Sequence, residues 1–367
     1  MLLEMAQSVP NAVHLEIGQP CFPTPPHIVE AGCRAAKDGE TRYTLNAGNV
    51  SLREKFAADL TRTTGAPTTA DNIVVTGGSM QALSASFAAL FNPGETALIP
   101  NPGYPNYTMM AQVFGIEPIY YPLYPDNGFH IGMDDLESRI GPSTKVIVTN
   151  SPANPTGAVF SETEVRELVA LAERHDLYIL SDEAYDRIIF EGDHVAPRKF
   201  DTSGRVISCY SFSKTYSMAG WRIGFLVAST EIAAIMTKMQ EVFVACASSV
   251  SQKAAEAAID GSQESVGAMV DFYRGNRDVA SEKLSEAGIP FVRPSGAFYT
   301  LIGLPDGEAD SFAFAEKLLK TTGVVVAPGR TFGSGTSRFI RISLAVQQPV
   351  LVDGLSRIID LYPNFCR

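Results

Sequence analysis

The chain has 367 residues, of which 45% are hydrophobic and 19% charged, and its formal net charge at pH 7 is −11. This length exceeds what one ordinary hydrophobic core uses, so we expect two domains. The acidic balance and the lack of a basic run argue against nucleic acid and anionic membrane as partners, and no apolar run approaches the roughly 20 residues that span a bilayer.

The first residues, MLLEMAQSVPNAVHLEIG, lack the basic flank and long apolar stretch of a secretion signal, so we expect none. The five cysteines are scattered without a CxxC spacing, which predicts reduced structural thiols and a cytoplasmic protein. The five histidines show no metal-binding spacing such as HExxH, so no metal site is expected.

Short apolar runs alternate with amphipathic helical stretches along the middle of the chain, a pattern typical of an α/β fold with a parallel sheet. We predict strands at 72–76, 95–100, 144–149, 177–181 and 205–210. One helix is predicted from Met80 to Phe91. Another begins after Ser161, which forms a capping box with Glu164 ahead of apolar residues at helical spacing.

The five predicted strands are followed by segments rich in polar residues and glycine. In chain order these segments are GGSMQAL, NPGYPNY, NSPANPTG, SDEAY and SFSK. Ligands of open parallel sheets bind beyond the carboxyl ends of the strands. The sequence therefore predicts a site at one sheet edge, built from glycines, hydroxyls, an amide, a carboxylate and a lysine.

Three of these segments also have a purely structural interpretation. The glycines before Ser79 suit a phosphate at a helix N-terminus, but also an ordinary tight turn, and the P-loop spacing is missing. Asp182, directly after a buried strand, needs a cationic or N–H partner, whereas we expect Glu183 and Asp186 to face water or cap the next segment. Tyr104 suits either a stacking surface or a core-filling role.

Two basic residues are placed unusually. Lys214 is the only charged residue from Val206 to Trp221. It is either a surface lysine or an amine whose neighbours lower its pKa, so that it acts as nucleophile and base. Arg341, in RFIRISLA, alternates with apolar residues on a late strand, so it either grips a carboxylate inside the protein or lies in solvent on an edge strand.

A competing motif is S-x-x-K, which Ser211 to Lys214 match and which carries the nucleophile of penicillin-binding proteins and β-lactamases. That family also needs a K-T-G further along the chain, and the sequence has none. A G-x-S-x-G nucleophile elbow is missing as well. Acylation of a serine is therefore disfavoured.

A lysine, an acidic partner, a phosphate cradle and a stacking aromatic together describe a site for pyridoxal phosphate. The segment SFSKTYSMAGWRIGF resembles the lysine motif of the class I/II aminotransferases of fold type I, the aspartate aminotransferase-like enzymes. The resemblance covers nearly the whole chain in the family's order. It includes GQP (18–20), RYTLNAGNVSLRE (42–54), GGSMQAL, NPGYPNY, NPTG (154–157), SDEAY, PSGAFY (294–299), APGRTFG (327–333) and RISLA (341–345).

The resemblance implies a role for each matching residue. Lys214 would form the Schiff base with pyridoxal 5′-phosphate and shuttle the proton, while Asp182 would pair with the pyridine nitrogen. Tyr185 and Asn154 would hydrogen-bond the phenolic oxygen of the ring, and Tyr104 would stack on its face. The phosphate would be held by Gly78, Ser79, Met80, Ser211, Ser213 and Arg222.

Further implied roles concern the substrate and a second subunit. Arg341 would bind the substrate's α-carboxylate, helped by the Gly18 backbone and Asn154. Tyr43 would reach the phosphate of the neighbouring subunit, which makes a homodimer the expected active unit. The family's architecture implies a large domain over 20–260, with a mostly parallel sheet flanked by helices, and a smaller α/β domain formed by 1–19 and 261–367.

The implied activity is ping-pong transfer of an amino group from an L-amino acid to a 2-oxo acid. A neutral or aromatic donor is favoured, because Met80 replaces a lysine of some aspartate-specific relatives and aromatic residues are expected to line the site. These aromatic residues are Phe22, Tyr104, Phe298 and Phe332. Arg330 is expected at the entrance. A carbon–sulfur β-lyase and an aspartate-specific aminotransferase remain alternatives, whereas a DNA-binding regulator is disfavoured because no added basic module is present.

Overall fold

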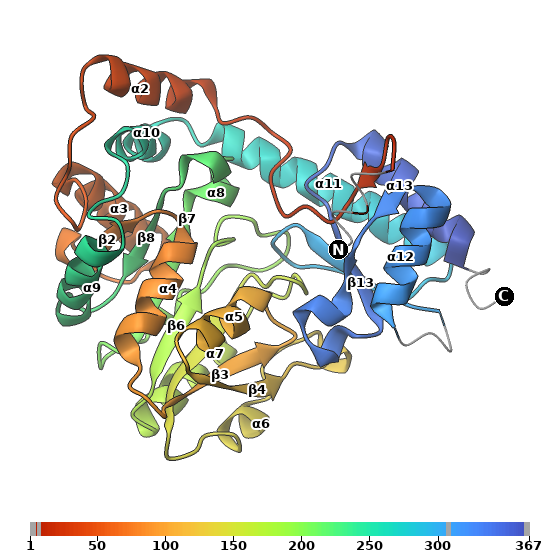
Figure 1. Cartoon of the computed structure of the whole chain (residues 1–367), viewed down its shortest axis with the longest axis horizontal. Helices are drawn as coiled ribbons and strands as arrows, with labels where there is room; N and C mark the ends of the chain where they lie inside the picture. Colours follow the sequence, from red (N-terminus) through yellow and green to blue (C-terminus); the bar gives the residue numbers. More distant parts are fainter. Residues whose placement is uncertain (1–4, 6–8, 306–309, 363–367) are drawn as a thin grey trace.

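The computed structural model describes Met5 and residues 9–305 and 310–362 (Figure 1). Its largest sheet has seven strands in the order β2-β8-β7-β6-β5-β3-β4. The strands are β2 (Ile73–Thr76), β3 (Thr96–Asn101), β4 (Glu117–Pro122), β5 (Thr144–Asn150), β6 (Tyr178–Asp182), β7 (Val206–Ser211) and β8 (Gly224–Val227).

All strands of this sheet except β8 run in one direction. The pairs β3–β4, β3–β5, β5–β6 and β6–β7 are parallel, whereas β8 is antiparallel to both of its neighbours, β7 and β2. The five predicted strands are confirmed to within a residue or two at each end, and their carboxyl ends lie at one edge. β4 and β8 were not predicted. β8 directly follows the lysine segment, which hid a strand of only four residues.

Helices cover both faces of the seven-stranded sheet (Figure 1). One face packs against α4 (Ser79–Leu90), α5 (Pro105–Val113) and α9 (Thr230–Phe243). The other face packs against α3 (Val50–Thr64) and α10 (Ser249–Asp260) at one end and against α6 (Met133–Glu137) and α7 (Glu162–Arg174) at the other. Burial on both faces explains why the strands read as continuous apolar runs rather than as alternating ones.

The predicted start of α7 is confirmed. The Ser161 side chain accepts a hydrogen bond from the Glu164 backbone, and the Glu164 carboxylate accepts one from the Ser161 backbone. These two bonds satisfy N–H groups that have no partner inside the helix. The helix ends at Arg174, and His175 follows it with an ion pair to Glu137.

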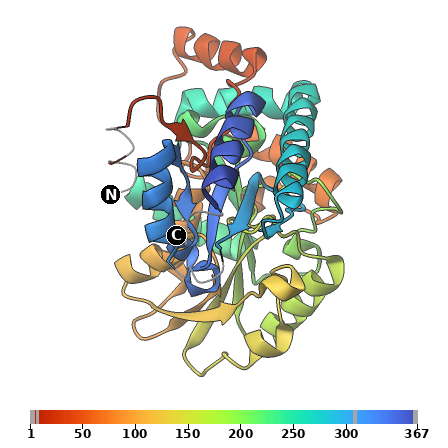
Figure 2. The same cartoon turned by 90° about the vertical axis from the view of Figure 1, so that its right-hand side faces the viewer.

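A smaller unit contains an antiparallel sheet of order β12-β13-β10-β9 (Figure 2). Its strands are β9 (Phe291–Val292), β10 (Tyr299–Gly303), β12 (Ala327–Pro328) and β13 (Phe339–Ser343). Three helices pack in the same apolar cluster: α11 (Glu264–Glu286), α12 (Ser311–Thr322) and α13 (Gln348–Leu361). The segment before α2 (Pro26–Lys37) joins this unit, because β1 (Val13–His14) pairs with β11 (Val324–Val325).

Candidate active site

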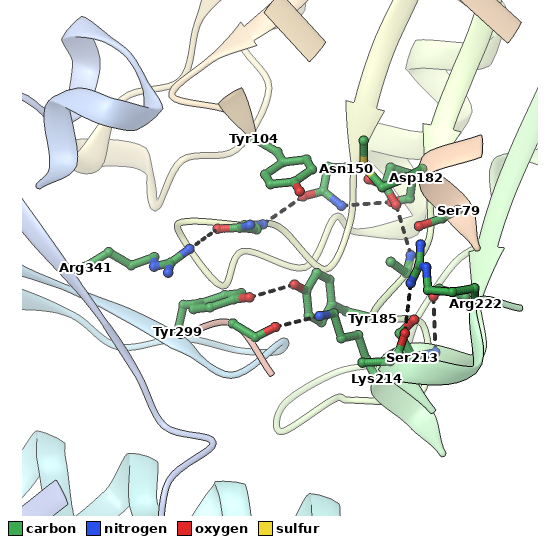
Figure 3. A pocket seen from close by; sticks show the side chains of 16 residues that line it. Ser79, Tyr104, Asn150, Asp182, Tyr185, Ser213, Lys214, Arg222, Tyr299 and Arg341 are labelled. Atoms are coloured by element: carbon green, nitrogen blue, oxygen red, sulfur yellow. Dashed lines mark hydrogen bonds between the residues drawn. The ribbon is translucent and has the colours of Figure 1, made fainter. Parts of the chain in front are cut away.

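A cavity of about 390 Å³ lies at the carboxyl edge of the seven-stranded sheet, facing the smaller unit. Figure 3 shows Arg222 at one end of this cavity and Arg341 at the other, with Lys214, Tyr185 and Asp182 between them. The cavity is lined by Gly18, Ser79, Met80, Tyr104, Asn150, Asn154, Asp182, Ala184, Tyr185, Ser211, Ser213, Lys214, Ala219, Arg222, Tyr299 and Arg341.

Lys214 reaches the cavity from the short helix α8 (Phe212–Thr215), which begins where β7 ends. The Ser211 hydroxyl caps this helix by accepting a hydrogen bond from the Ser213 backbone, 3.2 Å away. The Lys214 amine donates to the Gly18 carbonyl at 2.6 Å. Burial, reinforced by the positive charges of Arg341 and Arg222, lowers the pKa of Lys214 to about 8, although Asp182 opposes the shift. The surface-lysine interpretation is therefore wrong.

Asp182 ends β6 and is only 5% exposed. Its carboxylate accepts hydrogen bonds from the Tyr107 hydroxyl at 2.7 Å and from the Ala184 backbone at 3.2 Å. Burial raises the pKa of Asp182 to about 6, and the two hydrogen bonds oppose this rise. Among the described residues no cation is in ion-pair contact with it, so this buried carboxylate is suited to a cationic ligand.

The next residue corrects a prediction. Glu183 does not face water, because its side chain is 0% exposed. Its carboxylate accepts hydrogen bonds from the Tyr210 hydroxyl at 2.7 Å and from Nε2 of His194 at 2.8 Å. Asp186 is likewise mostly buried, and burial raises its pKa. The prediction for Glu183 failed because its two partners come from other segments, 27 and 11 residues away in the sequence.

The Arg222 end of the cavity is built to receive an anion. Gly78 caps α4 with φ 91° and presents the first backbone N–H groups of that helix, beside Ser79. Arg222 has φ 52° and donates to the carbonyls of Ala219 at 2.9 Å and Gly77 at 3.1 Å. The positive φ of Gly78 favours glycine, and a Cβ atom there would lie 2.8 Å from the Arg222 guanidinium, which would have to move. A helix N-terminus beside a guanidinium attracts negative charge.

The opposite end is dominated by Arg341, which lies on β13 and is 6% exposed. Its guanidinium donates to the Asn154 side chain at 3.0 Å and to the Glu16 carbonyl. The guanidinium carbon lies 4.2 Å from the ring centre of Tyr299 and 4.7 Å from that of Phe332. Arg341 is therefore an inward residue and not a solvent-exposed one on an edge strand.

Two further contacts connect the ends of the cavity. The hydroxyls of Tyr185 and Tyr299 lie 2.8 Å apart. The Asn150 side chain accepts from the Asn154 backbone at 2.7 Å and donates to the Asp182 carbonyl at 2.9 Å. These bonds fix Asn154 and Asp182 relative to each other across neighbouring strands.

The cavity differs from the sequence prediction in several residues. Tyr43, which is expected to reach the site of a neighbouring subunit, is 87% exposed and lies outside this cavity, so its role stays a prediction. Of the four predicted aromatic residues only Tyr104 lines it: Phe298 is fully buried, while Phe22 and Phe332 line separate cavities. Arg330 lines the same cavity as Phe332. Conversely, no role was predicted for five residues, although all of them lie in quoted motifs: Tyr107, Asn150, Ala184, Ala219 and Tyr299.

Comparison with known proteins identifies the family. Residues 10–358 match the family model described as aminotransferase class I and II. The chain is 34% identical over 364 residues to an aromatic-amino-acid aminotransferase 2 of Thermococcus litoralis, covering 97% of this chain and 93% of that one. It is also 34% identical over 361 residues to an aspartate aminotransferase of Pyrococcus horikoshii, covering 97% and 92%.

Solved structures agree with this comparison. The aspartate aminotransferase from Thermus thermophilus with maleate superposes with a TM-score of 0.93 at 33% identity, covering 98% of this chain and 94% of that one. An aromatic aminotransferase from Pyrococcus horikoshii gives 0.94 at 32% identity, covering 100% of both chains.

The chain belongs to the class I and II aminotransferase family, with the α/β architecture of fold type I. It is a transferase enzyme of a family that uses pyridoxal phosphate, and the relatives' names favour transamination over carbon–sulfur cleavage. In the part of the chain that the structure describes, no helix is long and apolar enough to cross a membrane.

Proposed function

We propose that this chain binds pyridoxal 5′-phosphate and transfers an amino group from an L-amino acid to a 2-oxo acid by a ping-pong mechanism. The observation that carries the proposal is the Lys214 amine, whose lowered pKa leaves part of it neutral near pH 7 to 8. It shares one cavity with a buried carboxylate, an anion-binding helix terminus and a buried arginine.

The residues present fit this cofactor. Its phosphate suits the Arg222 end, with the N-terminus of α4, Gly78, Ser79 and Met80, and the hydroxyls of Ser211 and Ser213. The Asp182 carboxylate would pair with a protonated ring nitrogen, which would supply the cation that it lacks. Tyr104 offers a ring for stacking, while Tyr185 and Asn154 offer groups for the phenolic oxygen.

When bound, pyridoxal phosphate acts as an electron sink that acidifies the α-carbon of an amino acid attached to it. The chain's own residues would bind and orient the cofactor and the substrate, and would move the proton. Lys214, in its neutral form, would accept the proton from Cα of the substrate. The resulting ammonium would then donate this proton to C4′ of the cofactor. Asp182 holds a cationic ring nitrogen by its negative charge, and Tyr185, bonded to Tyr299, is fixed in orientation.

Arg341 is the proposed binding group for the α-carboxylate of the substrate. Its Nε atom has no hydrogen-bond partner among the described residues, and burial lowers its pKa because the charged form loses hydration. A carboxylate supplies the missing acceptor and the opposite charge in a fork geometry. The Gly18 backbone and Asn154 lie beside it in the cavity wall.

A neutral or aromatic amino donor is proposed. The three cations of the cavity wall are Lys214, Arg222 and Arg341, and each already has a role. Met80, where some aspartate-specific relatives carry a lysine, adds no charge to the wall, and Arg330 is exposed on a different cavity. Relatives named for both aromatic and aspartate donors exist, so an aspartate-specific enzyme is the second candidate.

The test is a panel of amino donors against 2-oxoglutarate and pyruvate, read as kcat/KM because specificity is a ratio of these values. We expect phenylalanine, methionine or alanine to exceed aspartate. An aspartate value more than tenfold above all three would reject the neutral-donor proposal. Release of pyruvate from cystathionine without an added oxo acid would instead indicate a β-lyase.

A homodimer is proposed as the active unit. Tyr43 and Leu45 are 87% and 61% exposed, and Val242 is 82% exposed, which is unusual for neighbouring large apolar side chains. A second cavity of about 660 Å³ shares Ala219 and Arg222 with the first and so opens toward the proposed phosphate site. A partner's Tyr43 entering there would donate to the phosphate. Tyr43→Phe should weaken the binding free energy of pyridoxal phosphate by roughly 1.5–3 kcal/mol, and a fully active monomer would contradict the dimer.

The division into 20–260 and a discontinuous domain of 1–19 with 261–367 is also a proposal. It is supported by the separate cores of the seven-stranded and four-stranded sheets. A cytoplasmic location is proposed from the cysteines, since Cys21, Cys33, Cys209 and Cys246 are unpaired. Cys366 lies outside the described residues.

A further inference from the structure

A buried ion pair lies directly behind the carboxylate that faces the cavity. Asp182 and Glu183 are consecutive, yet their side chains have different partners: Tyr107 on α5 for Asp182, and Tyr210 and His194 for Glu183. The Glu183 side chain is 0% exposed and the His194 side chain 9%. The proposed function gives this pair no part.

The hydrogen bonds indicate that Glu183 is ionised. Its Oε2 atom accepts both bonds, at 2.7 Å from Tyr210 and 2.8 Å from His194, and its Oε1 atom has no partner among the described residues. An ionised Oε2 can accept from both groups, whereas a proton on Oε2 would need Nε2 of His194 as its acceptor and would reverse that bond. A carboxylate is therefore the form that matches these contacts.

His194 can change its charge without changing this geometry. Its Nε2 atom makes the bond to Glu183, while its buried Nδ1 atom has no partner in the described part of the chain. A proton can therefore bind to or leave Nδ1 while the Nε2–H bond stays in place. Burial lowers the pKa of His194, but the hydrogen bond to Glu183 and the charges of Glu183 and Asp186 raise it overall.

Other ionisable groups surround the pair but do not replace His194. Arg187 is engaged with Asp59 and Asp186. Among the described residues, His194 is the only cation in ion-pair contact with Glu183. The groups whose charges act on the pair are Asp182, Asp186, Arg187, Arg198, Cys209 and Tyr210, with Asp59 and Asp201 next to them.

We propose that His194 and Glu183 are positioning residues for the reaction: the charge of His194 offsets that of Glu183 and so keeps the neighbouring Asp182 ionised. This role rests on the proposed function, whereas the coupling itself is a property of the protein without any ligand. With His194 neutral, the pair carries one negative charge next to Asp182 in the chain, and like charges in a poorly hydrated interior disfavour each other.

Two single substitutions should act in opposite directions. His194→Gln keeps a donor for Glu183 but removes the positive charge, so the titration midpoint of Asp182 should rise. Glu183→Gln removes the negative charge, so the midpoint should fall at pH values where His194 keeps its proton. Each shift should be about one pH unit, the order expected for one nearby charge in a protein interior. The double variant restores a neutral pair and should return the midpoint close to that of the unmodified protein.

The measurement is carboxyl ¹³C NMR of the apoprotein with labelled aspartate, with the Asp182 signal assigned by its loss in Asp182→Asn. A matched control is His130→Gln, since His130 pairs with Glu164 at 2.9 Å on α7, with its side chain 40% exposed. This control should leave the Asp182 midpoint unchanged. General structural damage would move both single variants the same way.

Shifts in the same direction, or no shift in either variant, would overturn the proposal. If His194→Gln does not fold, His194→Asn takes its place: a higher midpoint supports the coupling, and an unchanged or lower one rejects it. The pH at which the Kd for pyridoxal phosphate changes should move with the Asp182 midpoint in each variant. Because the NMR titration needs no substrate, its outcome is independent of whether the enzyme transaminates.

Discussion

The two ends of the cavity are held in different ways. At the Arg222 end the residues come from one sheet, because Ser79, Asp182 and Ser211 each lie where a parallel strand ends or a helix begins after one. At the other end Arg341 lies on the four-stranded sheet and is contacted by Glu16, Asn154, Tyr299 and Phe332, which belong to four separate segments. The groups proposed for the chemical step are thus positioned by a single sheet. The group proposed to bind the carboxylate is positioned where the two units contact each other.

A set of hydrogen bonds joins the two units beside the cavity. The Asn101 side chain donates to Ser334 at 2.8 Å and accepts from the Gly335 backbone at 3.1 Å. The Gly103 backbone donates to the Phe332 carbonyl at 2.9 Å. Phe332 in turn covers the Arg341 guanidinium. The position of the arginine therefore depends on the loop that follows β3 as well as on its own strand.

The largest effect is expected at the single-sheet end. Lys214→Ala should lower kcat/KM by on the order of 10⁴-fold or more, because nucleophile and proton carrier are lost together. The unmodified protein with pyridoxal phosphate should be yellow, and borohydride should bleach it irreversibly by reducing the imine at Lys214. The variant has no such imine, so borohydride should not attach the cofactor to it. If the variant turned over at the rate of the unmodified protein, the catalytic role assigned to Lys214 would be wrong. Lys145→Ala, on β5 away from the cavity, is the matched control.

Asp182→Asn should lower kcat by on the order of 10²–10³-fold, as for loss of one preorganised electrostatic group. The amide keeps the shape of the carboxylate but cannot hold a cation, so binding of pyridoxal phosphate should weaken less than turnover. The check is kcat measured together with the cofactor Kd. Normal turnover in this variant would mean that another group interacts with the ring nitrogen.

Arg341→Gln separates recognition from chemistry. It should raise KM for amino acids, with kcat/KM falling on the order of 10²–10³-fold, the range for losing one partner of a buried charge pair. Amines that lack a carboxylate should be affected far less, and cofactor binding should be unchanged. A loss that is equal for both substrate types would show that Arg341 supports the fold and not the carboxylate.

The smallest predicted effect is a pH dependence of Lys214. Its pKa falls from 10.5 to about 8 on folding, so the neutral amine is available above about pH 8. Uptake of pyridoxal phosphate by the apoprotein should therefore rise with a midpoint near pH 8. The lowered pKa also means that this lysine's contribution to stability is present above pH 10.5 and is lost as the pH falls through about 8. A midpoint near 10.5 would contradict the burial of the amine.

The sequence predicted the single-sheet end better than the other. Five strands and the polar segments after them are local patterns, and the capping box of α7 lies within four residues. Contacts over long separations were missed, because no local pattern announces a partner. Tyr107 reaches Asp182 from 75 residues away, and Glu183 was predicted in water because its partner Tyr210 is 27 residues distant.

The aromatic residues of the substrate end illustrate the same limit. Phe298 and Tyr299 are adjacent on the chain, yet only Tyr299 lines the cavity, because neighbouring side chains at the start of β10 point to different sides. Choosing between them requires the register of β10 against β13, which pairs Tyr299 with Ser343. The position of Tyr43 relative to any second subunit likewise depends on an assembly that one chain's sequence does not specify.

The antiparallel strand β8 has a consequence for the motion of the lysine segment. Lys214 and Arg222 lie on the connection between β7 and β8. These two strands pair with each other inside the sheet, with Tyr210 opposite Phe225 and Ser211 opposite Gly224. A Cβ atom at Gly224 would lie 2.5 Å from the Tyr210 carbonyl, so this closure is tight. A movement of the segment from Phe212 to Ile223 requires breaking the backbone hydrogen bonds between β7 and β8. Amide protons of β7 and β8 should therefore exchange with solvent only when the protein unfolds globally or nearly so. Amide protons of the surface helices should exchange much faster, through local unfolding.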